Sequence, residues 1–220
     1  MVGSKIRVLI VEDEGLMRDM LRISLSAYPN LEVVGAVGDG ESAVKAAEEL
    51  APDVVLMDIE LGDGPSGIEA GHRIKARQPR VGIVILSFHQ EKQYIASLPA
   101  NKASGWSYLL KQSVADTAAL TRAIEGSAAG FVVLDPAIVE GLRPAVNSPV
   151  EHLTVRQREV LELMAQGYKN AAIAERLTVS EKSIENYINA IFQELGITRE
   201  DPVHPRVKAV LTYLQQTRSR

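Results

Sequence analysis

Five side chains that could do chemistry stand at the ends of apolar runs in the first half of the sequence. They are Glu12, Asp13, Asp58, Ser87 and Lys111. Three carboxylates brought close together repel one another, and a hard divalent cation such as Mg²⁺, which prefers oxygen ligands, relieves that repulsion. If Mg²⁺ and Lys111 neutralise an incoming phosphoryl group, a carboxylate in line with the phosphorus can attack it and form an aspartyl phosphate. We predict that Asp58 is this nucleophile.

The elements that must position these side chains alternate along the first half of the chain. Strands are predicted at 6–11, 32–37, 53–59, 81–87 and 107–111, and helices at 16–28, 41–50, 67–77 and 114–130. The strand runs are nearly all apolar, which indicates a parallel sheet covered by helices on both faces, an α/β fold. Ligands of such sheets bind beyond the carboxyl ends of the strands, where the five side chains should converge.

Each of the five residues also has an ordinary structural explanation. An acid after a strand often caps a helix, a serine often bonds the local backbone, and a surface lysine is usually solvated. The coincidence of all five at the ends of successive strands favours a functional site over that explanation.

The segments VLIVEDE, VVLMDIELGDGPSGIEA, ILS and YLLK resemble the receiver domains of two-component response regulators, over roughly residues 5–128. The resemblance implies a flavodoxin-like, doubly wound sheet of five parallel strands. It also implies a partner, a cognate sensor histidine kinase that phosphorylates Asp58.

The resemblance further implies Mg²⁺ as the cofactor. Asp13 and Asp58 would be metal ligands, with Glu12 assisting through water. Glu60 would contribute its backbone carbonyl.

Three more residues receive roles from the same resemblance. Ser87 would bond a phosphoryl oxygen, Lys111 would pair with the phosphoryl group, and Tyr108 would be the aromatic switch that moves inward on activation. The segment NKASGWSYLLK looks about two residues longer than the common pattern, with Trp106 and Ser107 added.

The second half of the chain has a different organisation. Residues 131–150 contain three prolines and one short helical turn, which indicates an interdomain connection. We therefore expect a receiver at 1–130, a linker at 131–150 and a second domain at 151–220.

Helices without strands are predicted after residue 150, at 154–166, 171–177, 181–195 and roughly 203–217. The first three have capping residues at their starts, namely Thr154 with Gln157, Asn170 and Ser180. Their lengths and the tight turn between the second and third are typical of a helix-turn-helix, whose recognition helix enters the major groove of double-stranded DNA.

Residues 153–197 resemble the DNA-binding domain of LuxR/NarL-type regulators along their whole length. Apolar residues at helical spacing should face the core, namely Val179, Ile184, Ile188 and Ile191. The outward residues are the candidates for DNA contact, namely Lys182, Ser183, Glu185, Asn186 and Asn189. Asparagine can bond adenine, serine and lysine can hold phosphates, and glutamate can accept from cytosine.

An apolar stripe runs along the last helix and consists of Val207, Val210, Leu211 and Leu214. The stripe suits either core packing or the pairing of two DNA-binding domains, as the resemblance implies. We expect the active protein to be a homodimer on DNA.

Charge and composition limit the function classes. Residues 1–149 carry 14 basic and 19 acidic side chains, and residues 150–220 carry 10 and 9, so charge by itself is weak support for DNA binding. The absence of cysteine excludes disulfides and thiolate metal sites. Without a signal peptide or an apolar stretch of membrane-spanning length, we expect a cytoplasmic protein that does not interact with membranes.

These observations together predict a DNA-binding transcription factor switched by phosphorylation of Asp58, and not an enzyme. One alternative is a phosphorylation-independent DNA-binding regulator whose receiver serves dimerisation. Another is a metal-dependent phosphohydrolase, which would use Asp58 as nucleophile and Glu60, two residues later, as acid/base.

Overall fold

The structure, a computed structural model, describes residues 4–88, 102–198 and 200–219. They divide into two compact units. Residues 4–88 and 105–130 belong to the first unit, and all described residues from 131 onward belong to the second.

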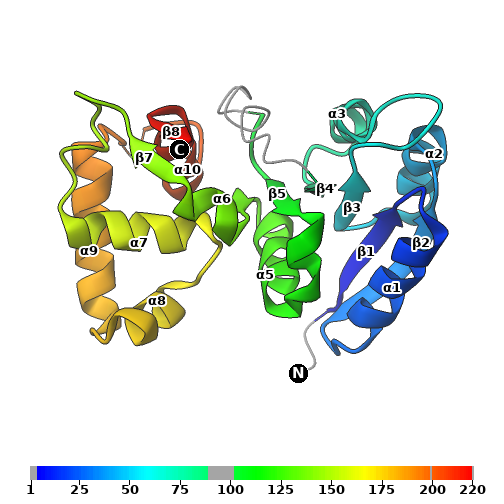
Figure 1. Cartoon of the computed structure of the whole chain (residues 1–220), viewed down its shortest axis with the longest axis horizontal. Helices are drawn as coiled ribbons and strands as arrows, with labels where there is room; N and C mark the ends of the chain where they lie inside the picture. The colour runs from blue at the N-terminus through cyan, green and yellow to red at the C-terminus, as the bar shows by residue number, and fades with distance from the viewer. Residues whose placement is uncertain (1–3, 89–101, 199, 220) are drawn as a thin grey trace. The chain divides into compact units, whose positions relative to one another are not determined.

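The first unit is a parallel sheet flanked by helices (Figure 1). Its strands are β1 (Ile6–Val11), β2 (Leu31–Val37), β3 (Val54–Asp58), β4 (Gly82–Ser87) and β5 (Trp106–Leu110). Its helices are α1 (Gly15–Ser26), α2 (Gly40–Leu50), α3 (Gly67–Arg77) and α5 (Thr117–Ala128), with a 3₁₀ turn at Lys111–Ala115. The strands lie side by side in the order β2-β1-β3-β4-β5. The predicted α/β fold with five parallel strands is confirmed.

The register of the strands brings their carboxyl ends to one edge of the sheet. Asp58, the last residue of β3, lies opposite Leu86, and Ser87, the last residue of β4, lies opposite Leu110. The strands β3, β4 and β5 are buried along their whole length, and β1 is buried from Val8 to Val11, so helices on both faces supply the core contacts. Since Lys111 directly follows β5, four neighbouring strands deliver polar side chains to the same edge.

Trp106 and Ser107, the two residues that we predicted to be added, are the first residues of β5. They pair in register with Ile83 and Val84. The Trp106 ring is buried against Gly71, where a Cβ atom would come within 2.8 Å of the ring. Ser107 is equally buried, and its hydroxyl lies 2.6 Å from that of Ser127. Asn101, the first residue of the segment, lies outside the described residues.

The second unit is mainly helical. Its elements are β6 (Val133–Leu134), α6 (Pro136–Glu140), β7 (Leu142–Pro144), α7 (Val155–Ala165), α8 (Asn170–Leu177), α9 (Glu181–Glu194), α10 (Pro205–Gln215) and β8 (Thr217–Ser219). The expectation of no strand after residue 150 is wrong, because β8 pairs antiparallel with β7. A three-residue strand is too short to produce a periodic signal.

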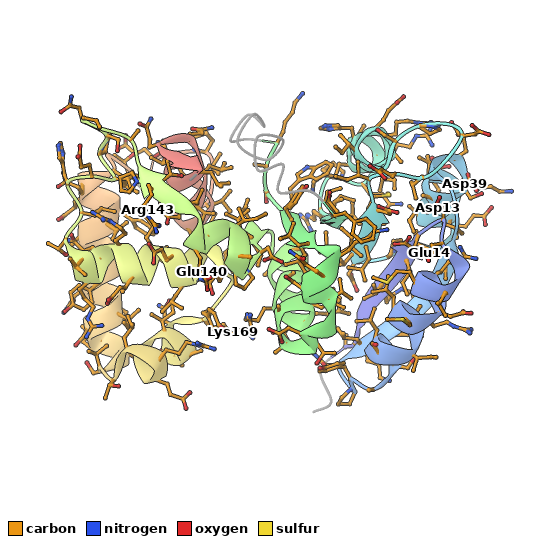
Figure 2. The ribbon with its side chains drawn as sticks, viewed as in Figure 1. Asp13, Glu14, Asp39, Glu140, Arg143 and Lys169 are labelled. Atoms are coloured by element: carbon orange, nitrogen blue, oxygen red, sulfur yellow. The ribbon has the colours of Figure 1, made fainter. Side chains whose placement is uncertain are left out.

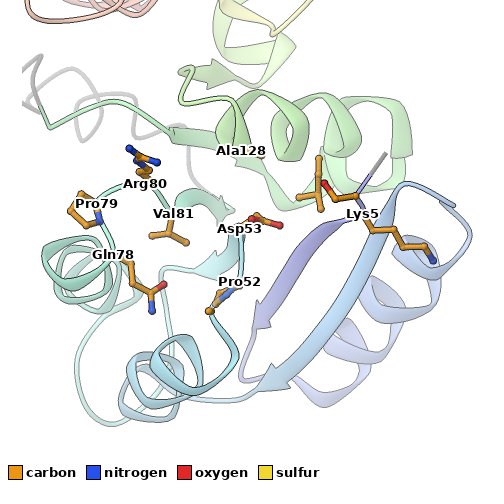
Figure 3. Close-up of a pocket in the computed structure, with 11 residues that line it drawn as sticks. Lys5, Pro52, Asp53, Gln78, Pro79, Arg80, Val81 and Ala128 are labelled. Atoms are coloured by element: carbon orange, nitrogen blue, oxygen red, sulfur yellow. The ribbon is translucent and has the colours of Figure 1, made fainter. Parts of the chain in front are cut away.

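A surface pocket of about 730 Å³ lies at the opposite edge of the sheet from Asp58 (Figure 3). Residues just before the strands line it, among them Lys5, Asp53 and Val81. None of the predicted site residues lines this pocket. Separately, no helix of the described residues combines the length and the apolar character that crossing a membrane requires.

Candidate functional site

A buried ion-pair cluster joins three of the predicted residues at the carboxyl edge of the sheet. The Nζ atom of Lys111 donates to Asp58 Oδ2 at 2.7 Å and to Glu12 Oε1 at 2.9 Å. The exposed fraction is 8% for Lys111, 3% for Asp58 and 0% for Glu12. Lys111 therefore reaches from the end of β5 across β4 to β3 and β1, as the parallel topology allows.

Arg18 on α1 supports the backbone that carries Glu12. Its guanidinium donates to the carbonyl oxygen of Glu12 at 2.6 Å and to that of Asp13 at 3.3 Å. These bonds satisfy two carbonyls in the loop where β1 passes into α1. Arg18 was not predicted from the sequence, because a half-buried arginine on an amphipathic helix has no distinguishing pattern.

Burial and the ion-pair contacts shift the pKa values of Glu12 and Lys111 in opposite directions. Burial raises the pKa of Glu12, and the hydrogen bond from Lys111 only partly offsets that rise. Burial alone would lower the pKa of Lys111, but the hydrogen bonds to Asp58 and Glu12 outweigh it, so the pKa is raised. The lysine is therefore held protonated beside the two carboxyl groups.

The carboxylates form a set that could hold a metal ion. Glu12, Asp13 and Asp58 each offer an oxygen within 4.8 Å of the others. Asp13 is exposed at the start of the loop after β1 and is labelled in Figure 2. The second carboxylate oxygen of Glu12 is buried without a hydrogen-bond partner. Such an oxygen is suited to a hard cation, so the donor set fits Mg²⁺.

The remaining predicted residues of the first unit lie on the elements around Asp58. Glu60 is exposed, and its backbone N–H donates to Asp58 Oδ1 at 3.3 Å. Ser87 is buried at the end of β4, and Tyr108 is fully buried within β5.

Gly67, the first residue of α3, lets that helix approach Asp58. A Cβ atom at this position would collide with the carbonyl oxygen of Asp58 and lie 2.8 Å from its carbonyl carbon. The backbone N–H of Gly67 donates to the carbonyl of Ile59 at 3.0 Å. The start of α3 is thereby packed against the backbone that carries Asp58.

The Gly67→Ala variant is expected to lose about 3 kcal/mol of unfolding free energy, because backbone atoms cannot move aside as a flexible side chain can. Urea unfolding would measure the loss. Gly15→Ala is the matched control: it is the first residue of α1, its Cβ would meet only the Arg18 guanidinium at 3.7 Å, and it should change stability by less than about 0.5 kcal/mol. Equal stabilities of the two variants would contradict the close packing at Gly67.

Phe88 was not predicted and belongs to the surroundings of the site. It directly follows Ser87, and its ring centre lies 5.0 Å from Lys111 Nζ. Its position next to Ser87 was the available signal, but an aromatic residue after a strand has many ordinary explanations.

In the second unit, α8 and α9 pack together as a helix-turn-helix. Thr178 in the turn has φ 55°, and Ser180 caps α9 by accepting from the N–H of Ser183. Thr154 and Gln157 form the predicted capping box of α7. The predicted cap of α8 is wrong: the helix begins at Asn170, whose side-chain oxygen accepts from Arg206 of α10 at 3.4 Å.

The predicted faces of α9 are largely those of the structure. Ile184, Ile188 and Ile191 are buried, and Val179 before the helix is half-buried. The candidate DNA contacts that are exposed are Lys182, Glu185, Asn186 and Asn189. Ser183 is only half-exposed, and its hydroxyl lies 2.8 Å from that of Ser180.

Two of the exposed candidates neutralise each other. Lys182 Nζ lies 2.8 Å from Glu185 Oε2, and this contact raises the pKa of Lys182. Because both side chains are exposed, the ion pair is weak and can be exchanged for a phosphate.

The apolar stripe of α10 is core and not a free face. Val207, Val210, Leu211 and Leu214 are all buried within the second unit, where α10 packs on α7 and α9. A pairing of two DNA-binding domains through this stripe is therefore excluded in the conformation described.

Both units match families of known proteins. Residues 8–125 match the response regulator receiver domain family, and residues 151–202 match the family described as bacterial regulatory proteins, luxR family. The transcriptional regulatory protein DegU of Brevibacillus brevis is 34% identical, over 88% of this chain and 89% of its own.

Two further similarities cover different extents of the chain. The nitrate/nitrite response regulator protein NarP of Escherichia coli is 34% identical, over 96% of this chain and 95% of its own. A solved structure described as a two-component response regulator of the LuxR family, from Aurantimonas sp. SI85-9A1, is 33% identical. It covers 62% of this chain and 94% of its own, with a TM-score of 0.55.

Proposed function

This chain belongs to the two-component response regulators that join a receiver domain to a LuxR-type DNA-binding domain, and from that premise we propose that phosphorylation of Asp58 controls its binding to double-stranded DNA. The observation that carries the proposal is the buried cluster in which Lys111 bonds both Asp58 and Glu12. The phosphoryl group comes from a sensor histidine kinase. The proposal assigns the receiver to residues 1–130, the linker to 131–150 and the DNA-binding domain to 151–220.

Each polar residue at the sheet edge has a separate part in the transfer. An Asp58 oxygen bonds to phosphorus as the donor's leaving group departs. Lys111, already 2.7 Å from Asp58, stays beside the new phosphoryl group and balances its charge. Ser87 donates its hydroxyl to a phosphoryl oxygen.

Glu12, Asp13, Asp58 and the backbone carbonyl of Glu60 are the residues that would hold Mg²⁺. The bound cation would neutralise negative charge on the phosphoryl oxygens. The buried oxygen of Glu12 that has no hydrogen-bond partner supports this assignment, since burying such an oxygen costs free energy that a bound cation would offset.

The consequence of phosphorylation is a shift between populations of the receiver. Movement of Ser87 towards the phosphoryl group changes the surface near Tyr108, which acts as the switch residue. The shift favours a homodimer that presents two α9 helices to DNA. The phosphotransfer serves signalling, without the sustained turnover that would make the protein an enzyme.

DNA contact is assigned to Lys182, Ser183, Glu185, Asn186 and Asn189 of α9. The exposure of four of them at the start and middle of the helix supports this assignment. Asn186 and Asn189 are one helical turn apart and are the side chains suited to bonding adenine.

The function is tested by mapping bound genomic DNA fragments with the full chain, with and without acetyl phosphate and Mg²⁺. Phosphorylated protein is expected to enrich specific fragments that the Asp58→Ala variant does not enrich under the same conditions. Identical enrichment by wild type with and without the donor would favour the phosphorylation-independent alternative.

A change at the Lys182–Glu185 pair tests the DNA interface itself. Glu185→Gln is expected to strengthen nonspecific DNA binding and to steepen the salt dependence of log K by about 1, because Lys182 becomes available to one more phosphate. Fluorescence anisotropy with random-sequence duplexes at several salt concentrations would measure both. Glu175→Gln on α8 removes the same charge without releasing Lys182, and an equal effect of the two substitutions would contradict the pairing.

A further inference from the structure

Arg18 of α1 is bound to the main chain of the loop that follows β1. Its Nη1 atom donates to the carbonyl oxygen of Glu12 at 2.6 Å and to that of Asp13 at 3.3 Å. Arginine side chains commonly pair with carboxylates, as Arg22 does with Asp19 on the same helix. In the part of the chain that the structure describes, Arg18 forms no ion pair with an acidic side chain. Its hydrogen bonds therefore serve the backbone at Glu12 and Asp13.

The guanidinium of Arg18 has a fitted place beside this loop. Gly38 directly follows β2, and a Cβ atom there would come within 3.3 Å of Arg18 Nη1 and 3.8 Å of the Glu12 carbonyl oxygen. The N–H of Glu12 donates to the carbonyl of Val37 at 3.1 Å, which brings the end of β2 against the same backbone. The half-buried side chain of Arg18 is thus held between α1, the loop after β1 and the end of β2.

The backbone that Arg18 holds carries two of the candidate metal ligands. Glu12, Asp13 and Asp58 each offer an oxygen within 4.8 Å of the others. Glu12 is already fixed by burial and by its bond with Lys111. Asp13 is exposed, so packing does not fix its carboxylate, and the direction of that carboxylate depends on the backbone of the loop. Because Mg²⁺ demands ligands close to octahedral positions, the conformation of this backbone affects the affinity for the metal.

The positive charge of Arg18 acts in the opposite sense, because it repels a cation at the same site. Two features make this repulsion the smaller effect. The guanidinium is only half-buried, so solvent screens its charge, and it is directed at two carbonyl oxygens. Residues that orient metal ligands through hydrogen bonds typically change metal affinity by about 10- to 100-fold. The hydrogen bonds of Arg18 should therefore outweigh its charge.

We infer that Arg18 is a positioning residue for Mg²⁺ binding: its two hydrogen bonds hold the backbone of Glu12 and Asp13 in the conformation in which the carboxylates take up the metal. A guanidinium has no acceptor atom, so Arg18 contributes no ligand and acts through the backbone. The inference rests on the proposed function, because both concern the same carboxylates. It adds a residue of α1 to a site otherwise built from the ends of the strands.

Urea unfolding of the full chain at increasing concentrations of Mg²⁺ alone, at constant ionic strength, measures the affinity for the metal. Each variant is compared with its own Mg²⁺-free state, so the stability that the substitution itself removes cancels. Arg18→Ala is expected to need about tenfold more Mg²⁺ than wild type for the same stabilisation. Arg18→Lys keeps the charge and a donor group but not the guanidinium fork, and is expected to need about threefold more.

Two further variants calibrate the measurement. Arg22→Ala removes an exposed arginine of the same helix, bonded to Asp19 at 3.3 Å, and should keep the wild-type dependence on Mg²⁺. Asp13→Asn removes a candidate ligand and shows how much of the stabilisation comes from this site. If Arg18→Ala does not fold, Arg18→Lys provides the same comparison.

An unchanged Mg²⁺ dependence in the Arg18 variants would overturn this inference alone, when Mg²⁺ stabilises wild type more than Asp13→Asn. Tighter Mg²⁺ binding by Arg18→Ala would also overturn it, because repulsion by the guanidinium would then be the larger effect. Equal stabilisation of wild type and Asp13→Asn would overturn the metal assignment of the proposed function, and this inference with it.

Discussion

Replacing Asp58 with asparagine is expected to abolish covalent phosphate uptake. The amide has nearly the same shape as the carboxylate but is not a competent nucleophile towards phosphorus. The exposed residues Asp13 and Glu60 have no comparable contact with Lys111, which bonds Asp58 and Glu12. Intact-protein mass after incubation with acetyl phosphate and Mg²⁺ would show one added phosphoryl group on wild type and none on Asp58→Asn.

The control for this substitution is Asp53→Asn, just before the opposite end of the same strand. Asp53 accepts from the backbone N–H of Arg7 and lies in the pocket remote from the carboxylate cluster. This variant should take up phosphate as wild type does. Stoichiometric uptake by Asp58→Asn would show that another residue is the phosphoacceptor.

Replacing Lys111 with methionine is expected to lower the unfolding free energy by about 3–5 kcal/mol in the presence of a metal chelator. The substitution leaves Glu12 and Asp58 buried next to each other without a compensating cation. Chemical unfolding followed by circular dichroism would measure the loss. Lys45→Met is the control, because Lys45 is an exposed lysine 3.9 Å from Glu49, and its loss should change stability by less than about 0.5 kcal/mol.

The destabilisation of Lys111→Met should also depend on pH. Burial raises the pKa of Glu12 already in wild type, and without Lys111 nothing offsets that rise. Over the pH range between the two pKa values of Glu12, the folded variant holds a proton that the unfolded chain releases. The unfolding free energy lost relative to wild type is therefore largest at high pH, and the loss shrinks as pH falls towards 4.5, the ordinary pKa of glutamate. A loss of unfolding free energy that stays constant between neutral pH and pH 4.5 would contradict the role assigned to the buried charges.

The sequence predicted the receiver fold well because its signals are local. The run Ile6–Val11 is apolar except at Arg7, a pattern typical of a strand covered on both faces. The convergence of Asp58 and Lys111 followed from this, because parallel strands place all their carboxyl ends at one edge.

The sequence did not predict the contacts of residues whose neighbours come from a distant part of the chain. Asn170 is a residue type that often caps helices, but its side chain accepts a hydrogen bond from Arg206, 36 residues later. Nothing near Trp106 in the sequence shows that Gly71 leaves space for its ring. The strands β7 and β8 pair across more than 70 intervening residues, so neither is visible by itself.

The sequence by itself determined which side chains reach the edge of the sheet and which face of α9 is polar, since both follow from the periods of strand and helix. Only the tertiary structure decided what those side chains touch. Lys111 lies against Asp58, Glu12 and the ring of Phe88, and the apolar stripe of α10 lies inside the second unit. The physical reason is that periodicity specifies the direction of a side chain relative to its own backbone, whereas its neighbour, its charge balance and its exposure depend on elements brought in from elsewhere in the chain.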